Sequence, residues 1–386
     1  MKVIQRTLGP LLVIGTAVML LIGGIYSPTY DWDIIGYVAS AHYADGLRGA
    51  ELSRRTYDDV KQQVGPDVFD GLVAGRYRRT VHDDPRSLEQ QLPYYRIRIA
   101  FVQSMRALKW VGLSYPKSTV TISALFSAAS MFLLALLCRE MNLSLLWVAP
   151  AASIAGFGAL ARLPLPDAMA CFFALLTTCL VIKGDLKYFA VAAVLPLFRT
   201  DFVVLSVLVA AAGFFRGRRM LSTLSMVTAL VLFISINALM RHYGWLTQFN
   251  VSLISVQPYP QEMTFSRQPL QYLMPYVRGA WNAVFHPHGA IYMLGIACAV
   301  RGILSPLRDD IKLAIGLAYL FVAMHMVLYP VYEDRFFVYA AAVVFLGTAS
   351  AVTAALSEGS IARWPGLTQA LRNARRALSR FPPRKA

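Results

Sequence analysis

Charged residues are scarce in this chain, and their scarcity excludes an ordinary soluble protein. Only 15% of its 386 residues are Asp, Glu, Lys or Arg, whereas 57% are hydrophobic and the mean hydropathy is +0.51. Soluble globular domains carry about a quarter charged residues. The composition therefore predicts an all-α polytopic membrane protein.

Motifs of several enzyme classes are also missing. The sequence contains no Gly-rich phosphate loop, no GxSxG elbow and no HExxH motif, so nucleotide-dependent and zinc-protease functions have no support. The four cysteines lie in or beside apolar runs and form no CxxC pair, so neither disulfides nor thiolate metal sites are expected. The sequence also has no internal repeat.

Basic residues are in excess, with a formal net charge of +16. They lie in short segments between apolar runs and in the last part of the chain, which suits anionic lipid head groups better than nucleic acid. Residues 357–386 combine apolar residues at three- and four-residue spacing with arginines elsewhere around the helix. This segment is predicted to be a basic amphipathic tail on the cytoplasmic leaflet.

Ten apolar runs are predicted to cross the membrane within a single domain, residues 1–356. The first, residues 8–25, follows a basic start and lacks a small-residue cleavage site, which indicates a retained signal anchor with its basic end in the cytoplasm. Alternating the runs puts the basic segments between them on the cytoplasmic side, as the positive-inside rule requires. The other nine runs are residues 118–138, 143–160, 166–182, 187–198, 201–214, 220–240, 288–304, 311–329 and 335–356.

This map contains one assumption, that residues 187–215 form a tight hairpin broken at Arg199-Thr200-Asp201. Each arm is shorter than the roughly 20 residues that a span needs, so the hairpin predicts a thin or water-filled region. A single continuous helix would instead place the basic group at residues 216–219 outside the cytoplasm.

Residues 26–113 are predicted to be one large extracytoplasmic loop that contains interfacial helices. Its last part, residues 94–111, is apolar overall, but each of its four basic residues would cost about 3 kcal/mol near the bilayer centre. Ile97, Phe101, Met105 and Leu108 recur at helical spacing, with the charges on other faces. That pattern predicts an amphipathic helix lying in the interface.

Isolated ionisable residues gather on the outer side of this map. Asp31 and Asp33 follow the first span, and Asp33 opens a short predicted helix, Asp33–Tyr43. Helical spacing brings Tyr37 onto the face of Asp33, so an aromatic hydroxyl is expected beside the acid. The other members of this rim are Arg162, Asp167, Arg199, Asp201, Arg241, His242, His286, His288, Glu333, Asp334 and Arg335.

A rim of this kind suits a reaction on a lipid-linked substrate. Transfer of a sugar from a lipid phosphate requires a base for the proton of the acceptor hydroxyl and cations for the leaving phosphate. One carboxylate is enough, because a phosphate leaves without the general acid that glycoside hydrolysis needs. The alternative is that Asp33 and Asp167 only cap their helices.

The order of these features resembles the GT-C glycosyltransferases, the group that includes protein O-mannosyltransferases and lipid A aminoarabinose transferases. The resemblance rests on a first span, on Asp33 with Tyr37 four positions later, and on Asp167 opening a later span after a short outer turn. Arg199-Thr200-Asp201 and Glu333-Asp334-Arg335-Phe336-Phe337 are similar to outer-turn motifs of bacterial members. The resemblance implies that Asp33 is the catalytic base, although Trp32 separates the two acids that are adjacent in those relatives and leaves Asp31 as an alternative.

The expected function is therefore inverting transfer of a sugar from a polyprenyl-phosphate donor to a lipid, glycan or protein acceptor at the outer face of a bacterial inner membrane. Asp31 and Asp167 are expected to support Asp33. The expected donor-phosphate ligands are Arg335, Arg199, Arg162, His286 and His288, and the expected orienting residues are Tyr37, Asp201, Glu333 and Asp334. A divalent metal held by the rim acids is left open.

Two other functions compete with transfer. A lipid-linked oligosaccharide flippase or another transporter would place ionisable groups near the midplane and would often show two related halves. An O-antigen polymerase or ligase would act on similar lipid substrates. The sequence identifies neither the sugar nor the acceptor.

Overall fold

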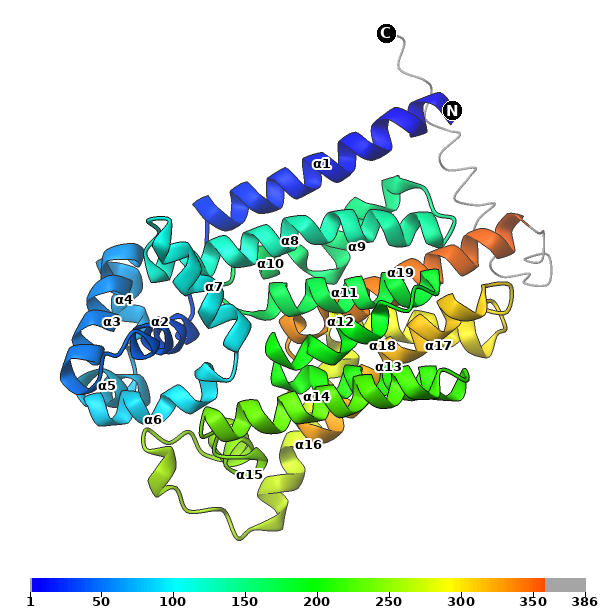
Figure 1. The fold of residues 1–386 in the computed structure, drawn as a ribbon. Coiled ribbons are helices and arrows are strands. Elements are labelled where there is room, and N and C mark those ends of the chain that lie inside the picture. The colour runs from blue at the N-terminus through cyan, green and yellow to red at the C-terminus, as the bar shows by residue number, and fades with distance from the viewer. Residues whose placement is uncertain (1, 358–386) are drawn as a thin grey trace.

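A computed structural model describes residues 2–357 of the chain, and all regular structure within them is helical. Apart from Ser357, the predicted tail at residues 357–386 lies outside the described residues. Figure 1 shows long helices lying side by side, with a group of shorter helices gathered at one end. The long helices are α1 (Lys2–Tyr26), α8 (Tyr115–Glu140), α14 (Arg219–Leu239), α18 (Asp309–Leu328) and α19 (Asp334–Ser357).

These five helices are long and apolar enough to cross a membrane. A sixth candidate is the pair α16 (Pro269–Phe285) and α17 (Pro287–Val300), which is bent by 75°. The membrane character predicted from composition is thus supported by five or six helices, and the number ten stays a prediction. The other predicted spans correspond to shorter helices, α9 (Val148–Ala155), α10 (Phe157–Arg162), α11 (Asp167–Lys183), α12 (Tyr188–Val194) and α13 (Val203–Phe215).

Two of the predicted runs are interrupted. The run at residues 143–160 starts with the 3-10 turn η1 (Leu145–Trp147) and breaks at Gly156, which ends α9 with a φ of 90° that favours glycine. The run after residue 187 breaks at Arg199, as predicted, between the 3-10 turns η2 (Leu195–Leu197) and η3 (Thr200–Phe202). Its two arms are in contact, because Ser206 Oγ on α13 donates a hydrogen bond of 2.6 Å to the carbonyl of Ala192 on α12.

Contacts between helix ends agree with the predicted alternation. Arg216, after α13, pairs with Asp310 on α18 at 2.6 Å. Arg308, just before α18, donates to the carbonyl of Ile182 at 2.8 Å and lies 3.7 Å from Glu140 at the end of α8. These segments are far apart in the sequence, and the alternation assigned all of them to one side.

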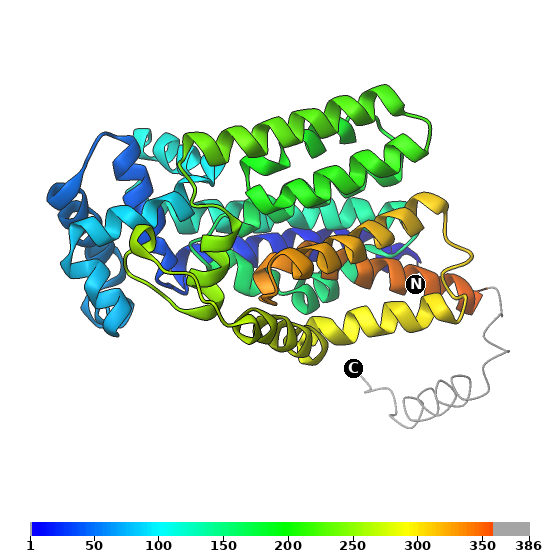
Figure 2. The same cartoon turned by 90° about the horizontal axis from the view of Figure 1, so that it is seen from below.

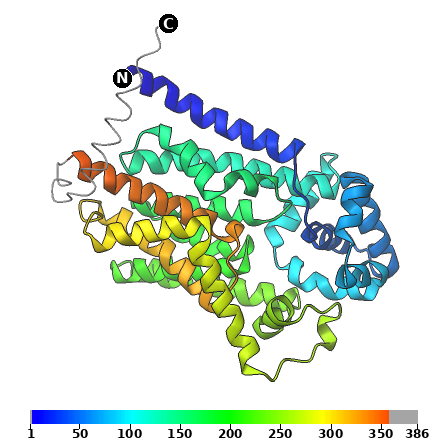
Figure 3. The ribbon, with the colours of Figure 1, turned by 180° about the vertical axis from the view of Figure 1, so that it is seen from behind.

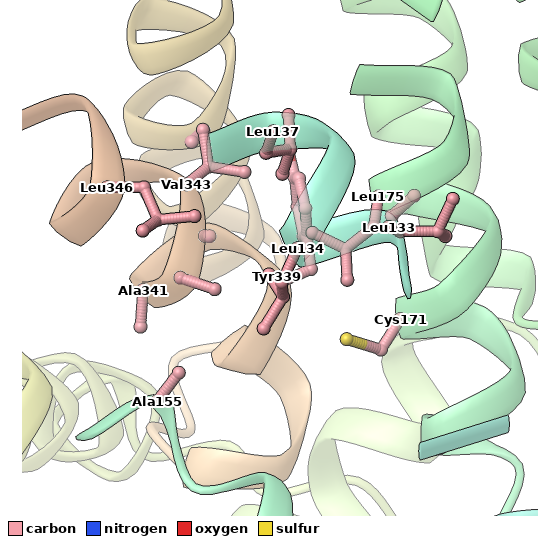
Figure 4. Close-up of a cluster of buried hydrophobic side chains, with 14 of the residues drawn as sticks. Leu133, Leu134, Leu137, Ala155, Cys171, Leu175, Tyr339, Ala341, Val343 and Leu346 are labelled. Atoms are coloured by element: carbon pink, nitrogen blue, oxygen red, sulfur yellow. The ribbon is translucent and has the colours of Figure 1, made fainter. Parts of the chain in front are cut away.

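Helix α19 occupies the centre of the main apolar core. The eight residues Phe337–Val344 are each 2% exposed or less, so this part of α19 is covered on every side. Figure 4 shows Tyr339, Ala341, Val343 and Leu346 beside leucines of α8 and beside Cys171 and Leu175 of α11. The core fixes where α19 begins, and therefore where Arg335 is held.

The loop helices form a second core around α2 (Asp33–Ala44), whose residues Ile34–His42 are all buried. This layer stands at one end of the long helices (Figures 1 and 3). The other helices of the layer are α3 (Gly49–Val64), α4 (Pro66–Leu72), α5 (Arg76–Asp83), α6 (Pro85–Arg96) and α7 (Ile99–Trp110).

The amphipathic helix predicted at residues 94–111 is divided. Helix α6 ends at Arg96, and α7 starts at Ile99. Phe101 and Met105 are buried as expected, but the charges bind protein groups: Arg98 donates to Thr200 Oγ1 at 3.2 Å, and Arg106 and Lys109 pair with Asp45 at 3.0 and 2.9 Å. A layer with its own core offers these basic residues partners that an isolated interfacial helix lacks.

A strap at residues 255–268 crosses the loop layer. It follows α15 (Trp245–Phe249) and the π-helical turn η4 (Asn250–Ile254), contains the turn η5 (Pro260–Glu262), and leads into α16. Ser87 and Gln91 on α6 both donate to the carbonyl of Pro258, at 2.6 and 2.9 Å. Figure 2 shows the strap from below, next to α6 and the start of α16.

Candidate functional site

A cavity of about 570 Å³ lies where the loop layer meets the first turn of α19. It is lined by Asp31, Trp32 and Asp33 at the start of α2, by Arg335, by residues Ala74–Arg78 at the start of α5, and by Val256 of the strap. The lining thus combines two carboxylates with three arginines. Two of the arginines, Arg76 and Arg78, lie within the loop predicted at residues 26–113 and are not among the predicted site residues.

Asp33 is held by two side chains from distant parts of the chain. Tyr95 on α6 donates its hydroxyl to one carboxylate oxygen at 3.0 Å, and Arg335 Nη1 donates to the other at 3.2 Å. Both carboxylate oxygens are thus occupied by side chains, which a simple cap on the first turn of α2 would not explain. The side chain is 29% exposed, so it is accessible from the cavity.

The aromatic hydroxyl that donates a hydrogen bond to Asp33 belongs to Tyr95, and Tyr37 makes no such bond. Helical spacing does turn Tyr37 towards the same face, but its ring is only 6% exposed and packs edge-on against Tyr95 and Phe101, with 5.1 Å between ring centroids in both pairs. Tyr37 therefore supports the ring of Tyr95 from within the core. It is not among the residues that line the cavity.

Gly36 leaves room for Tyr95. A Cβ atom at Gly36 would lie 2.5 Å from the Tyr95 ring, so we expect Gly36→Ala to lower the free energy of unfolding by about 1–3 kcal/mol, as overpacking does. Chemical unfolding in detergent measures this. Gly71→Ala, where nothing lies within 4 Å, is the matched control, and it should be neutral or slightly stabilising. An equal cost of Gly36→Ala in a Tyr95→Ala background would contradict the proposed clash.

Asp31 is the less completely bound of the two acids. Its Oδ2 lies 3.6 Å from Arg335 Nη1, while its Oδ1 is buried without a hydrogen-bond partner among residues 2–357. Burial raises the pKa of Asp31 to about 7, and the nearby carboxylates of Asp33 and Asp167 act in the same direction, against the guanidinium of Arg335. Asp31 is therefore able to exchange a proton near neutral pH.

The raised pKa of Asp31 predicts a pH-dependent stability. Its ordinary pKa is about 4, so between about pH 4 and pH 7 the folded protein holds a proton that the unfolded chain has lost, and the folded state loses stability as the pH rises through that window. Asp31→Asn removes this loss, so its melting temperature relative to wild type should increase from pH 5 to pH 8. Asp58→Asn, at an exposed pair with Arg54, is the control. A constant difference across that range would contradict the shift.

Behind the cavity, Arg199 is bound by two carboxylates. It forms two hydrogen bonds with Asp201, of 3.0 and 2.8 Å, and a third with Asp167, and its side chain is only 6% exposed. His325 Nδ1 lies 3.5 Å from Asp201. Asp167, at the start of α11 and 4% exposed, is therefore bound to an arginine in addition to any capping role.

The guanidinium groups of Arg199 and Arg335 both lie near the ring of Phe336. The guanidinium of Arg199 lies 4.3 Å and that of Arg335 5.1 Å from the ring centroid of Phe336. Asp167 also acts electrostatically on Asp31. Arg335 in turn binds Glu333 at 2.6 Å. The structure thus brings Asp31, Asp33, Asp167, Arg199 and Arg335 into one neighbourhood, with Asp201 and Glu333 as partners of the arginines.

Eight further predicted residues do not line the cavity: Asp167, Arg199, Asp201 and Glu333, described above, and Arg162, His286, His288 and Asp334. Arg162 Nε donates to the carbonyl of Ser27 at 2.6 Å and so ties the end of α1 to α10. His288 is 1% exposed, and its ring nitrogens lie 3.0 Å from Tyr332 OH and 3.1 Å from the carbonyl of Ala155. His286 Nε2 contacts the carboxylate of Asp334. The contacts of Arg162, His286, His288 and Asp334 explain their positions without a ligand.

Sequence reasoning missed four residues of this site: Trp32, Arg76, Arg78 and Tyr95. Trp32 is 8% exposed and packs against Tyr77 with 5.4 Å between ring centroids. The signal for Arg76 and Arg78 is their position on either side of Tyr77, at a helix start that follows Gly75. The sequence does not show that Arg76, Arg78 and Tyr95 lie near Asp33, because this depends on how α5 and α6 pack around α2.

The arrangement can accept a proton at Asp31 or Asp33 and can stabilise negative charge at Arg335, within one accessible cavity. Asp31, Asp33 and Glu333 converge on the Arg335 guanidinium. Among residues 2–357, no group of three or more His, Cys, Asp or Glu side chains is placed to hold a metal ion. Comparison of the chain with protein-family models, with characterised proteins and with solved structures finds no match.

Proposed function

We propose that the chain is an integral membrane glycosyltransferase of the GT-C type, which transfers a sugar from a polyprenyl-phosphate donor to an acceptor hydroxyl. The observation that carries this proposal is the shared cavity of Asp33 and Arg335 at one end of the long apolar helices. A carboxylate and an arginine in contact supply the base and the phosphate ligand that such a transfer needs.

The reaction consists of one displacement. Asp33 takes the proton of the acceptor hydroxyl while that oxygen attacks the anomeric carbon of the donor sugar. The bond from the anomeric carbon to the phosphate oxygen breaks, and the polyprenyl phosphate leaves with the electron pair, stabilised by Arg335. Attack from the face opposite the leaving group inverts the anomeric configuration.

The other residues support these two. Asp31, in contact with Arg335, is the second candidate for the base and supplies a site for the released proton. Arg199 acts as a positioning residue, because its side chain is only 6% exposed, does not line the cavity and lies over Phe336 beside Arg335. Glu333 orients Arg335, because its carboxylate accepts a hydrogen bond from Arg335 Nε.

The proposed setting is the bacterial inner membrane, with ten spans and the cavity facing the periplasm. Sugar nucleotides are scarce on that side, so a donor carried on a lipid is the expected substrate. Arg335 stands at the start of an apolar helix, where the phosphate of a membrane-anchored donor would lie. The short arms α12 and α13 fit a thin region beside it.

Purified protein in detergent, given a polyprenyl-phosphate sugar and a mixture of envelope lipids and glycans, should form a new glycosidic bond. The buried charges around Arg199 favour a transporter as the second candidate, because transporters also hold ionisable groups between apolar helices. A flippase would move the donor across a vesicle without releasing polyprenyl phosphate, and that result would overturn the proposal. Transfer of only a preassembled oligosaccharide would indicate a polymerase or ligase instead.

A further inference from the structure

The start of α5 contributes a second basic group to the cavity. Gly75, Arg76, Tyr77 and Arg78 all line it, together with Asp31, Asp33 and Arg335. Helix α5 begins at Arg76, and no side chain caps its first turn within the described chain. Its free N–H groups and the two guanidinium groups therefore create a region of positive charge inside the cavity.

Most of this positive charge is not neutralised by the protein. The Arg76 side chain is exposed, and no hydrogen bond or ion pair of it is found among residues 2–357. Arg78 donates only to the carbonyl of Gly71, at 3.3 Å. By contrast, Arg335 is already bound to Asp31, Asp33 and Glu333. The arginines of α5 are thus the cations of the cavity that have no carboxylate partner within the described residues.

A second observation points to a ligand in the same place. Trp32 lines the cavity and is 8% exposed, yet its indole Nε1 is buried without a hydrogen-bond partner in the described part of the chain. Asp31 Oδ1 is likewise buried without a partner there. Buried polar atoms are normally satisfied. Both groups border the cavity, and a bound ligand with an acceptor oxygen and a hydroxyl group would engage them if the two side chains turn towards it.

We propose that Arg76, Arg78 and the first turn of α5 bind an anionic group, a phosphate or carboxylate, of the acceptor. The inference rests on the proposed function, in which the donor carries its only phosphate next to its lipid chain. Figure 1 shows α5 in the part of the loop layer that faces away from the long helices, whereas Arg335 belongs to one of those helices, α19. A lipid-anchored phosphate therefore belongs at Arg335, and the anion at α5 belongs to the acceptor, which is an acidic saccharide or glycolipid.

Binding to the full-length protein in detergent tests this proposal with two probes. Glucose 6-phosphate represents an anionic acceptor, with glucose as its neutral control, and farnesyl phosphate represents the donor lipid. We expect the double variant Arg76→Ala/Arg78→Ala to weaken glucose 6-phosphate binding by about tenfold or more, since each arginine supplies charge-assisted hydrogen bonds. Farnesyl phosphate binding should be unchanged, and glucose should bind no variant measurably.

Three further variants separate the outcomes. Arg54→Ala, an exposed arginine of α3 away from the cavity, is the charge-matched control and should bind as wild type. Arg76→Glu keeps a long side chain at an exposed position and should also weaken glucose 6-phosphate binding by about tenfold or more, without lowering the melting temperature. Trp32→Phe keeps a ring but removes the N–H, and it should weaken binding about three- to tenfold.

Unchanged glucose 6-phosphate binding in the double variant would overturn the proposal, and so would a loss of farnesyl phosphate binding, because the anion would then be that of the donor. If wild type binds glucose 6-phosphate but forms no glycosidic bond with any donor, the proposed function fails while the anion site stands. If Asp33→Asn abolishes transfer while Arg76 and Arg78 affect neither probe, the function stands and the anion site fails.

Discussion

Asp33→Asn should lower the rate of sugar transfer by about 10²–10⁴-fold, the range that a positioned general base contributes. The asparagine oxygen can still accept the Tyr95 hydroxyl that now lies at 3.0 Å, so the side chain keeps its place. It can no longer accept a proton from an acceptor hydroxyl. The measurement is transfer from a polyprenyl-phosphate sugar, with the rate and the KM for the donor determined separately.

The protein should remain folded in this variant. Arg335 keeps Asp31 and Glu333 as partners, so the loss of one partly exposed ion pair should cost about 1 kcal/mol or less. Asp58→Asn removes the same charge from an exposed pair on α3 and should transfer sugar at the wild-type rate. If Asp33→Asn retains transfer and Asp31→Asn abolishes it, Asp31 is the base.

The sequence predicts the site to the extent that its residues are anchored to recognisable helix starts. Asp33, Asp167 and Arg335 each stand at the beginning of an apolar or amphipathic helix, and the positive-inside rule assigns those beginnings to one side. The structure places these three residues, from widely separated segments, in one neighbourhood. Apolar periodicity and charge placement were sufficient for this, because both reflect the cost of moving charge into hydrocarbon.

The partners of those residues were not predictable in the same way. Spacing within one helix indicated Tyr37 as the neighbour of Asp33, whereas the contact comes from Tyr95, 62 residues later in the chain. Helical spacing gives the direction of a side chain but not what packs against it. The division of residues 94–111 into α6 and α7 has the same origin, since Arg98 turns towards Thr200. Packing between distant segments determines both the hydrogen-bond partner of Asp33 and the break between α6 and α7.

The number of spans is the least determined feature. Hydropathy identifies ten apolar runs, but among residues 2–357 only five helices are individually long and apolar enough to cross, or six with the bent pair. Short helices such as α12 and α13 are buried against neighbours, so their length is set by packing as well as by bilayer thickness. A run of apolar residues alone does not distinguish a helix that crosses the membrane from a shorter helix that is buried within the protein.

Arg199→Met should lower the free energy of unfolding by about 3–5 kcal/mol, the cost of leaving buried charge without its partner. The substitution fills a similar volume but leaves Asp167 and Asp201 without the cation that both now bind. Asp167 is 4% exposed, so water cannot replace the guanidinium at that carboxylate. Chemical unfolding in detergent, followed by circular dichroism, measures the change.

Two further variants test whether the lost stability of Arg199→Met arises from unpaired charge. Arg216→Met, which breaks a half-exposed pair with Asp310, should cost about 1 kcal/mol or less. Adding Asp167→Asn and Asp201→Asn to Arg199→Met should recover much of the lost stability, because the three side chains are then neutral and the amides can hydrogen-bond to one another. If the triple variant is as unstable as Arg199→Met, the arginine acts through its packing on Phe336 at 4.3 Å, and not through its charge.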